Sequence, residues 1–233
     1  MISIIIPTLN EDKVIEPLLK SLKNQLSEED EIVIVDSQSK DNTIKIANKY
    51  TKSIYSTPKQ GVGLARTYGA KKAKNDYVAF LDADSVVSEN WLKRIKEYFK
   101  QGYTAVGGLD LYHSDSWLNK GIYNNYSRLV YLLSRVVHFT TGRYWIPSNN
   151  SAFDKKLFFS VGGYRSVVCE DIDLMKKLPS SRKVRFDSRI YVILSDRRFK
   201  EEGFLGTLWI WTKADIKGIF GDGMDVLKGY TKN

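Results

Sequence analysis

Two aspartates separated by one alanine, Asp82 and Asp84, are the residues that most directly suggest chemistry. They follow the apolar run 77–81, whose β-branched and aromatic residues are typical of a strand buried on both faces. In an open α/β sheet, ligands bind beyond the carboxyl ends of the strands. Carboxylates at that place can share a hard divalent cation with a phosphate. The alternative is that the two residues only form a turn and cap a helix expected from about residue 89.

The residues before Asp82 predict the sheet that would position it. Apolar runs at residues 2–6, 31–35, 53–56 and 77–81 predict four strands, and the segments between them favour helices. This βαβαβαβ order indicates a mostly parallel sheet with right-handed crossovers. Because every strand ends in polar, turn-forming residues, we expect these ends to form one rim.

Two common nucleotide sites are excluded by their motifs. A dinucleotide site of the oxidoreductase kind needs G-x-G-x-x-G after the first strand, where this chain has P-T-L-N-E. A P-loop motif is also absent.

Composition describes an ordinary globular chain. Of 233 residues, 42% are hydrophobic and 27% charged, with a formal net charge of +9. This charge permits phosphate-bearing ligands, anionic membranes or nucleic acid, but the basic residues are spread along the chain, which disfavours nucleic acid. The single cysteine, Cys169, excludes an intrachain disulfide, and neither a signal peptide nor a spanning apolar run is visible.

Four motifs occur in order: I-I-I-P-T-L-N-E, V-I-V-D-S-Q-S-K-D-N-T, G-V-G-L-A-R-T-Y-G-A and F-L-D-A-D. Together they resemble the amino-terminal half of the family-two glycosyltransferases of the GT-A fold. The resemblance implies a nucleotide-sugar site, in which the D-x-D segment holds Mg²⁺ or Mn²⁺ against the diphosphate through Asp82 and Asp84. The residues that it assigns to the nucleotide-sugar are Pro7, Thr8, Asn10, Glu11, Asp36, Arg66, Asp82, Ala83 and Asp84, with Asp41 supporting the loop.

The chain departs from the family at two positions. Thr67 follows the arginine where the family often has asparagine, and Val86 stands where some relatives with lipid acceptors carry a third polar metal ligand. Waters or a distant residue, His113 or His138, would then complete the metal shell.

The second half of the chain resembles the family's acceptor side. Residues 145–153 match a stretch that lines the acceptor, with Ser148 and Asn149 as candidate contacts. The segment C-E-D-I-D-L resembles a family signature that carries the general base, which implies Asp171 as the base and Glu170 as second choice. A helix start that favours negative charge is the alternative. Two further strands are expected at residues 103–109 and 190–194. Arg197 and Arg198 follow the second of these and could grip a phosphate, or be surface charge.

Two segments, 116–137 and 204–220, are amphipathic. In the first, the apolar residues of one face are Leu118, Ile122, Tyr126, Leu129, Leu133 and Val136. In both segments, aromatic and basic residues flank the apolar face. They are Trp117, Tyr123, Tyr131, Trp209, Trp211, Lys120, Arg128, Arg135, Lys213 and Lys217. These faces could pack on the sheet, or lie at a membrane interface. The second reading implies a cytoplasmic, peripheral protein with a lipid-linked acceptor such as polyprenyl phosphate.

We therefore expect an α/β protein of the GT-A fold, with a Rossmann-like, mostly parallel sheet flanked by helices, an irregular acceptor half and a C-terminal amphipathic helix. Residues 1–110 would bind the nucleotide-sugar, residues 111–200 the acceptor, and residues 201–233 would form a helical appendage and tail. The expected function is inverting sugar transfer from a nucleotide-sugar. The alternatives are a sugar-phosphate nucleotidyltransferase, which should carry a glycine-rich basic loop after the first strand, and a catalytically silent binding protein on the same fold.

Overall fold

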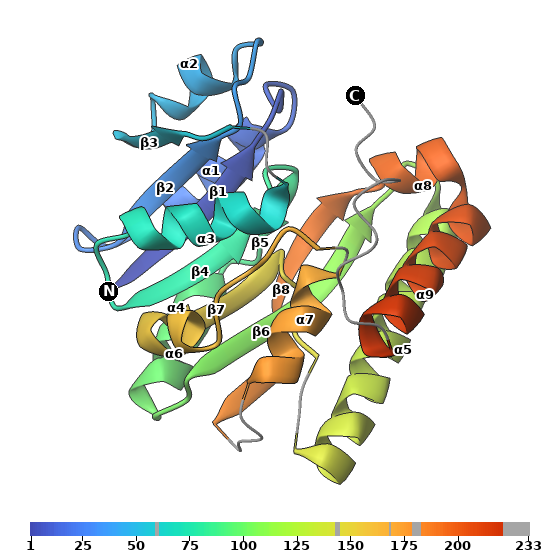
Figure 1. The fold of residues 1–233 in the computed structure, drawn as a ribbon. Helices are drawn as coiled ribbons and strands as arrows, with labels where there is room; N and C mark the ends of the chain where they lie inside the picture. Colours follow the sequence, from blue (N-terminus) through green and yellow to red (C-terminus); the bar gives the residue numbers. More distant parts are fainter. Residues whose placement is uncertain (59–60, 143–144, 168, 179–182, 221–233) are drawn as a thin grey trace.

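The computed structural model describes residues 1–58, 61–142, 145–167, 169–178 and 183–220, without the side chains of residue 198 and residues 214–220. Its centre is an eight-stranded sheet with the order β3-β2-β1-β4-β7-β6-β8-β5 (Figure 1). The strands are β1 (Ile2–Thr8), β2 (Glu31–Asp36), β3 (Ser53–Ser56), β4 (Tyr77–Leu81), β5 (Ser85–Val87), β6 (Ala105–His113), β7 (Asn150–Asp154) and β8 (Val184–Ser195).

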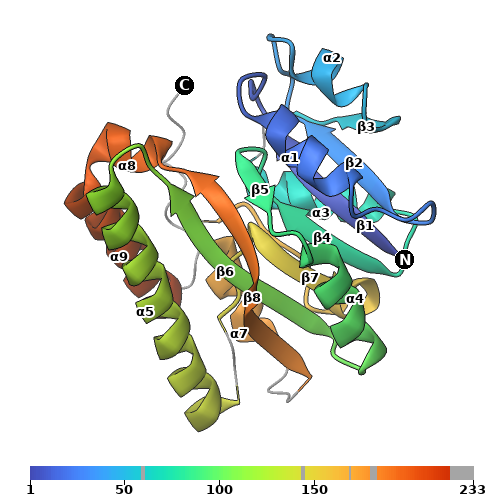
Figure 2. The ribbon, with the colours of Figure 1, turned by 180° about the vertical axis from the view of Figure 1, so that it is seen from behind.

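Helices cover both faces of the sheet. They are α1 (Ile15–Lys23), α2 (Thr43–Ala47), α3 (Val62–Lys72), α4 (Trp91–Lys100), α5 (Trp117–Thr141), α6 (Lys155–Ser160), α7 (Glu170–Lys177), α8 (Arg197–Glu202) and α9 (Phe204–Phe220). One core cluster joins the sheet to α1 and α4, and the other joins it to α3, α6 and α7. Figure 1 views the sheet from the α3 and α7 side, and Figure 2 from the α1 and α4 side.

The first four strands agree with the pattern in the sequence. β1, β2, β3 and β4 pair in parallel, so the polar residues after β1, β2 and β4 meet along one rim. β3 and β4 have the expected bounds. The first helix begins at Ile15, which leaves Pro17 in the first turn, where its missing N–H costs no helical hydrogen bond.

The second half extends the same sheet with mixed pairing. β7 was expected only as an acceptor-lining stretch, yet it pairs antiparallel with both β4 and β6. The strand expected at residues 103–109 is β6, which runs on to His113, and the strand expected at 190–194 is the end of the longer β8. A bulge between Gly108 and Leu109 shifts the β6–β8 register.

The outer surface of α5 is apolar and exposed. The buried residues of this helix are Tyr123, Ser127 and Ser134, while Trp117 is 84% and Phe139 90% exposed. The alternative in which the apolar face of 116–137 packs on the sheet is therefore wrong for five residues of that face: Leu118, Ile122, Leu129, Leu133 and Val136.

The other side of α5 packs on the segment after β8. The ring of Tyr123 stacks on Phe199 with centroids 4.0 Å apart, and Tyr126 lies near Trp211 of α9. Among the residues described, no helix combines the length and the hydropathy that crossing a bilayer requires.

Candidate active site

The loops after β1 and β2 are tied together by Asp36. Its Oδ1 accepts hydrogen bonds from Thr8 Oγ1 at 2.9 Å and from Ser39 Oγ at 2.5 Å, and its Oδ2 accepts one from the Ser39 amide. Asn10 has a left-handed backbone (φ 56°), and its side-chain oxygen accepts from the Lys40 amide. Asp41 accepts from the Asp12 amide and so also joins the two loops. The structure thus brings Thr8, Asn10 and Asp36 together, beside half-buried Pro7 at the end of β1.

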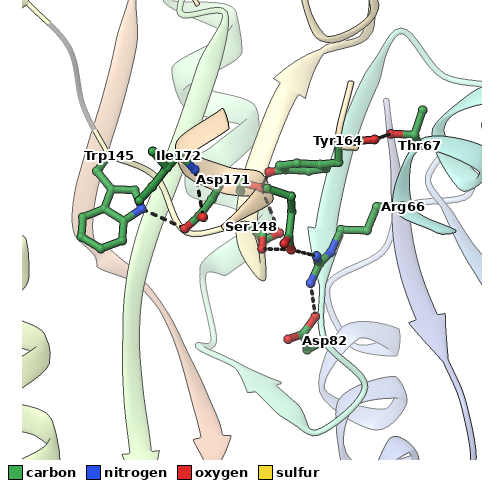
Figure 3. A network of polar contacts seen from close by, with 10 residues as sticks. Arg66, Thr67, Asp82, Trp145, Ser148, Tyr164, Asp171 and Ile172 are labelled. Atoms are coloured by element: carbon green, nitrogen blue, oxygen red, sulfur yellow. Dashed lines mark hydrogen bonds and ion pairs between the residues drawn. The ribbon is translucent and has the colours of Figure 1, made fainter. Parts of the chain in front are cut away.

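The centre of the candidate site is the buried guanidinium of Arg66, on α3 (Figure 3). It donates to Asp82 Oδ1 at 2.5 Å and to Glu170 Oε1 at 2.5 Å, and its side chain is only 2% exposed. Burial alone would lower the pKa of Arg66, but the charges of Asp82 and Glu170 raise it above its ordinary value. Arg66 therefore stays charged and joins the D-x-D segment after β4 to the first residue of α7.

Asp171 is oriented by two N–H donors. The indole Nε1 of Trp145 donates to Asp171 Oδ2 at 2.8 Å, and the Ile172 amide donates to Oδ1 at 2.9 Å (Figure 3). Glu170, by contrast, accepts from Arg66 and from Ser148 Oγ, both on Oε1. Glu170 thus forms an ion pair with Arg66, whereas the hydrogen bonds given above for Asp171 come from uncharged N–H groups.

Arg197, at the start of α8, lies between two acidic residues from the rim. Its guanidinium is 3.6 Å from Glu11 Oε2 and 3.9 Å from Asp84 Oδ2. The pKa of Glu11 is raised above its ordinary value, mainly because the side chain is partly buried. The charge of Arg197 lowers this pKa, and the charges of Asp84 and Asp82 raise it further. The predicted phosphate-binding arginine thus lies beside the predicted metal residues, whereas the side chain of Arg198 is outside the described residues.

The donor set fits a hard divalent cation that is partly held by its substrate. Asp82 and Asp84 offer carboxylate oxygens. The nearby Glu11 Oε2 is buried, and within the described part of the chain it has the ion pair with Arg197 but no hydrogen bond. Within the described ranges no three His, Cys, Asp or Glu side chains gather as a metal site. His113 lies beside Asp115, and His138 is in the last turn of α5. Two protein carboxylates with phosphate oxygens and water would be a sufficient ligand set for Mg²⁺ or Mn²⁺.

Asp110, on β6, is a site residue that the sequence reasoning missed. Burial raises its pKa to about 7. The side-chain amides of Asn149 and Asn150 oppose this rise, and the charges of Asp82 and Asp171 add to it. Trp145 lies in the stretch expected to line the acceptor, but its hydrogen bond to Asp171 was not foreseen. The position of the Tyr164 ring, 5.8 Å from the Arg66 guanidinium, was not foreseen either. Asp110 was missed because the strand was expected to end at residue 109, and the paired residues continue to His113.

The glycines of the G-V-G motif allow α3 to approach the segment that leads into α7. A Cβ on Gly63 would lie 2.2 Å from the carbonyl oxygen of Arg165, which no side chain tolerates. Gly61 has φ 94° and would meet Ser166 Oγ at 2.8 Å. These contacts hold the helix of Arg66 against the segment before Asp171.

Comparisons with known proteins agree with this arrangement. The family model described as "Glycosyl transferase family 2" matches residues 3–171. The poly(ribitol-phosphate) beta-N-acetylglucosaminyltransferase TarS of Staphylococcus aureus is 33% identical over 126 residues, covering 51% of this chain and 20% of TarS. The undecaprenyl-phosphate 4-deoxy-4-formamido-L-arabinose transferase of Aeromonas hydrophila is 30% identical over 131 residues, covering 52% of this chain and 40% of that protein.

Solved structures share the fold. The 1–349 part of TarS, in complex with UDP-GlcNAc, has a TM-score of 0.62 at 21% identity, covering 83% of this chain and 58% of that chain. Mannosyltransferase PcManGT of Pyrobaculum calidifontis, in complex with GDP-Man and Mn²⁺, has a TM-score of 0.64 at 16% identity. The match covers 91% of this chain and 64% of that chain. The chain spans a fifth of the length of TarS and two fifths of the Aeromonas protein. The expected α/β fold of the GT-A type is confirmed, and the chain belongs to glycosyl transferase family 2.

Proposed function

We propose that this protein transfers a sugar from a nucleotide-sugar to an acceptor, with inversion at the anomeric carbon. The observation that carries the proposal is the contact of Arg66 with both Asp82 and Glu170. Because Glu170 is next to Asp171 in the chain, this contact supports a single site that contains the candidate metal residues and the candidate base, Asp171. Membership of the family supports the reaction class.

In the proposed reaction, an acceptor oxygen attacks the anomeric carbon while the bond from that carbon to the diphosphate oxygen breaks. Asp171 accepts the proton of the acceptor hydroxyl, and Trp145 holds the carboxylate in position. A divalent ion held by Asp82 and Asp84 would supply the charge neutralisation that a leaving diphosphate needs. Arg197 would contact phosphate oxygens from the opposite side of the rim.

We further propose that the acceptor is lipid-linked and that α5 lies on an anionic membrane surface. The printed name of the Aeromonas relative contains undecaprenyl phosphate, which supports such an acceptor. If the attacking group is itself a phosphate, it needs no deprotonation, and Asp171 then only orients it. This reading implies a peripheral protein on the cytoplasmic face of the membrane.

The exposed side of α5 has the composition of an interfacial helix. Exposed apolar side chains run along its length, from Trp117 to Phe139. Lys120, Arg128 and Arg135 lie on the same helix, where cations meet anionic headgroups. Each cation near an anionic surface contributes about 1 kcal/mol.

Thermal-shift measurements test the reaction class. Nucleoside diphosphates and their sugars would be screened with and without Mn²⁺, and a ligand at about 100 times its Kd should stabilise the protein by roughly 2.7 kcal/mol. We expect nucleotide-sugars to stabilise the wild type only with the metal, and Asp84→Ala to abolish the metal-dependent part. If no nucleotide-sugar stabilises the protein with Mn²⁺ present, the proposed function is wrong.

Sedimentation with anionic phosphatidylglycerol vesicles tests the membrane proposal. We expect the wild type to sediment at low salt and to be released at high salt, and Leu129→Glu with Leu133→Glu to stay in the supernatant. Gln101→Glu, an exposed change of one charge at the end of α4, is the control and should behave as the wild type. If the wild type stays in the supernatant at low salt and glycosylates a soluble acceptor as well as a lipid-linked one, the membrane proposal is wrong.

A further inference from the structure

Asp110 lies on the part of β6 that extends beyond its pairing with β7. The β6–β7 pairing covers Ala105 to Gly107, with Gly107 opposite Ser151. β7 starts at Asn150, which is opposite Leu81, the last residue of β4. Asp110 is therefore beyond the beginning of β7, at the sheet edge to which β4 brings Asp82.

Asp110 is half-buried, and the Oδ1 atom of its carboxyl is buried. This Oδ1 has no hydrogen-bond partner among the described residues. The side-chain amides of Asn149 and Asn150 favour the charged form of the carboxyl. The charges of Asp82 and Asp171 both act on it. A buried acceptor without a partner lowers stability, so this group calls for an explanation outside packing.

The position of Asp110 points to the transferred sugar. In an inverting transfer the sugar lies between the leaving diphosphate and the attacking acceptor. Asp82 marks the diphosphate side and Asp171 marks the acceptor side, and Asp110 is within electrostatic reach of both. The groups that a sugar presents in that place are hydroxyls, which donate well to a carboxyl oxygen.

We propose that Asp110 accepts a hydrogen bond from a hydroxyl of the transferred sugar and helps to decide which sugar is used. This inference rests on the proposed transfer from a nucleotide-sugar. A site that hydrogen-bonds a substrate hydroxyl rejects analogues without it, because the buried partner is then left unpaired. Removing Asp110 should therefore weaken the binding of the sugar and leave the nucleotide contacts intact.

Calorimetric titrations of matched ligands with Mn²⁺ test the inference. The pairs are UDP-GlcNAc with UDP and GDP-mannose with GDP, and the proteins are the wild type, Asp110→Ser, Asp110→Asn and the exposed control Asp115→Asn. For the pair that the wild type prefers, Asp110→Ser should raise the Kd of the nucleotide-sugar about tenfold to a hundredfold, the effect of one charge-assisted hydrogen bond. The Kd of the free diphosphate should change less than about twofold, and Asp115→Asn should match the wild type in both.

The conservative variant separates binding from folding. Asp110→Asn keeps the shape and one acceptor oxygen, so we expect it to be folded and to lose less affinity for the nucleotide-sugar than Asp110→Ser. If both variants leave the ratio of the two Kd values unchanged, the inference about Asp110 is wrong while sugar transfer stands. The separate thermal-shift screen decides whether the reaction class itself fails.

Discussion

Replacing Arg66 by methionine removes the charge at the centre of the site and keeps most of the buried side-chain volume. The variant leaves Glu170, whose side chain is 14% exposed, and Asp82, which is 38% exposed, without their shared cation. Removing one partner of a buried ion pair costs about 3–5 kcal/mol. Water screens Asp82 more than Glu170, and the variant also avoids burying the guanidinium, so we expect a loss of about 2–4 kcal/mol.

Thermal and urea unfolding would measure this loss, which corresponds to a Tm lower by roughly 5–15 °C for a chain of this size. Lys20→Met is the control, because it removes a cation from an exposed pair with Glu16 at 3.7 Å and should cost less than about 1 kcal/mol. Adding Glu170→Gln to Arg66→Met removes one uncompensated charge and should restore part of the stability. A loss below about 1 kcal/mol for Arg66→Met, or no recovery in the double variant, would refute the ion-pair reasoning.

Three further predictions concern the carboxyl groups. Asp171→Asn should lower turnover about 10²–10⁴-fold and leave nucleotide affinity nearly unchanged, as measured by steady-state kinetics and titration. If Glu170→Gln lowers turnover in this way and Asp171→Asn does not, Glu170 is the base. Asp84→Ala should lose transfer activity that Mn²⁺ supports, and full activity of the wild type in excess chelator would contradict a metal requirement. The pKa of Asp110 is about 7 in the folded protein and ordinarily 3.8, so its contribution to stability is complete below pH 4 and lost as the pH rises to 7. The Asp110 carboxyl therefore contributes a fall in unfolding free energy as the pH rises from 4 to 7, of at most about 1.4 kcal/mol per pH unit, and Asp110→Asn should remove this fall. An unchanged pH dependence in urea titrations would show that the carboxyl ionises normally.

The donor side of the site was predictable because strand and chemistry are adjacent in sequence. An apolar run that ends in turn-forming residues marks β4, and Asp82 and Asp84 follow it directly. The same rule placed Thr8 and Asp36 at the ends of β1 and β2, where they form a hydrogen bond. The place of these residues at one rim needed only local pattern and the parallel topology, whereas their expected role at a nucleotide-sugar came from the resemblance to the family.

The remaining parts depend on contacts between distant segments. β7 has the sequence N-S-A-F-D, with little β propensity, and is a strand because β4 and β6 pair with it on both sides. Asp110 lies beside the candidate site only because β7 starts where it does. The apolar side of α5 has the same helical period whether it is covered or exposed, so its exposure could not be read from spacing. The ion pairs of Arg66 and Arg197 likewise join residues that lie far apart in the sequence.

The fit of Gly63 against the carbonyl of Arg165 bears on engineering of this fold. A chimaera that takes residues 1–110 from one relative and the rest from another would inherit the two sides of this contact from different parents. A shift of the segment at Arg165 by a fraction of an ångström would move α3, and with it Arg66, relative to the residues that follow Cys169. Such a hybrid could fold and still bring donor and acceptor together in an unproductive geometry. Exchange of sugar or acceptor preference is therefore better attempted by substituting single side chains than by swapping halves of the chain.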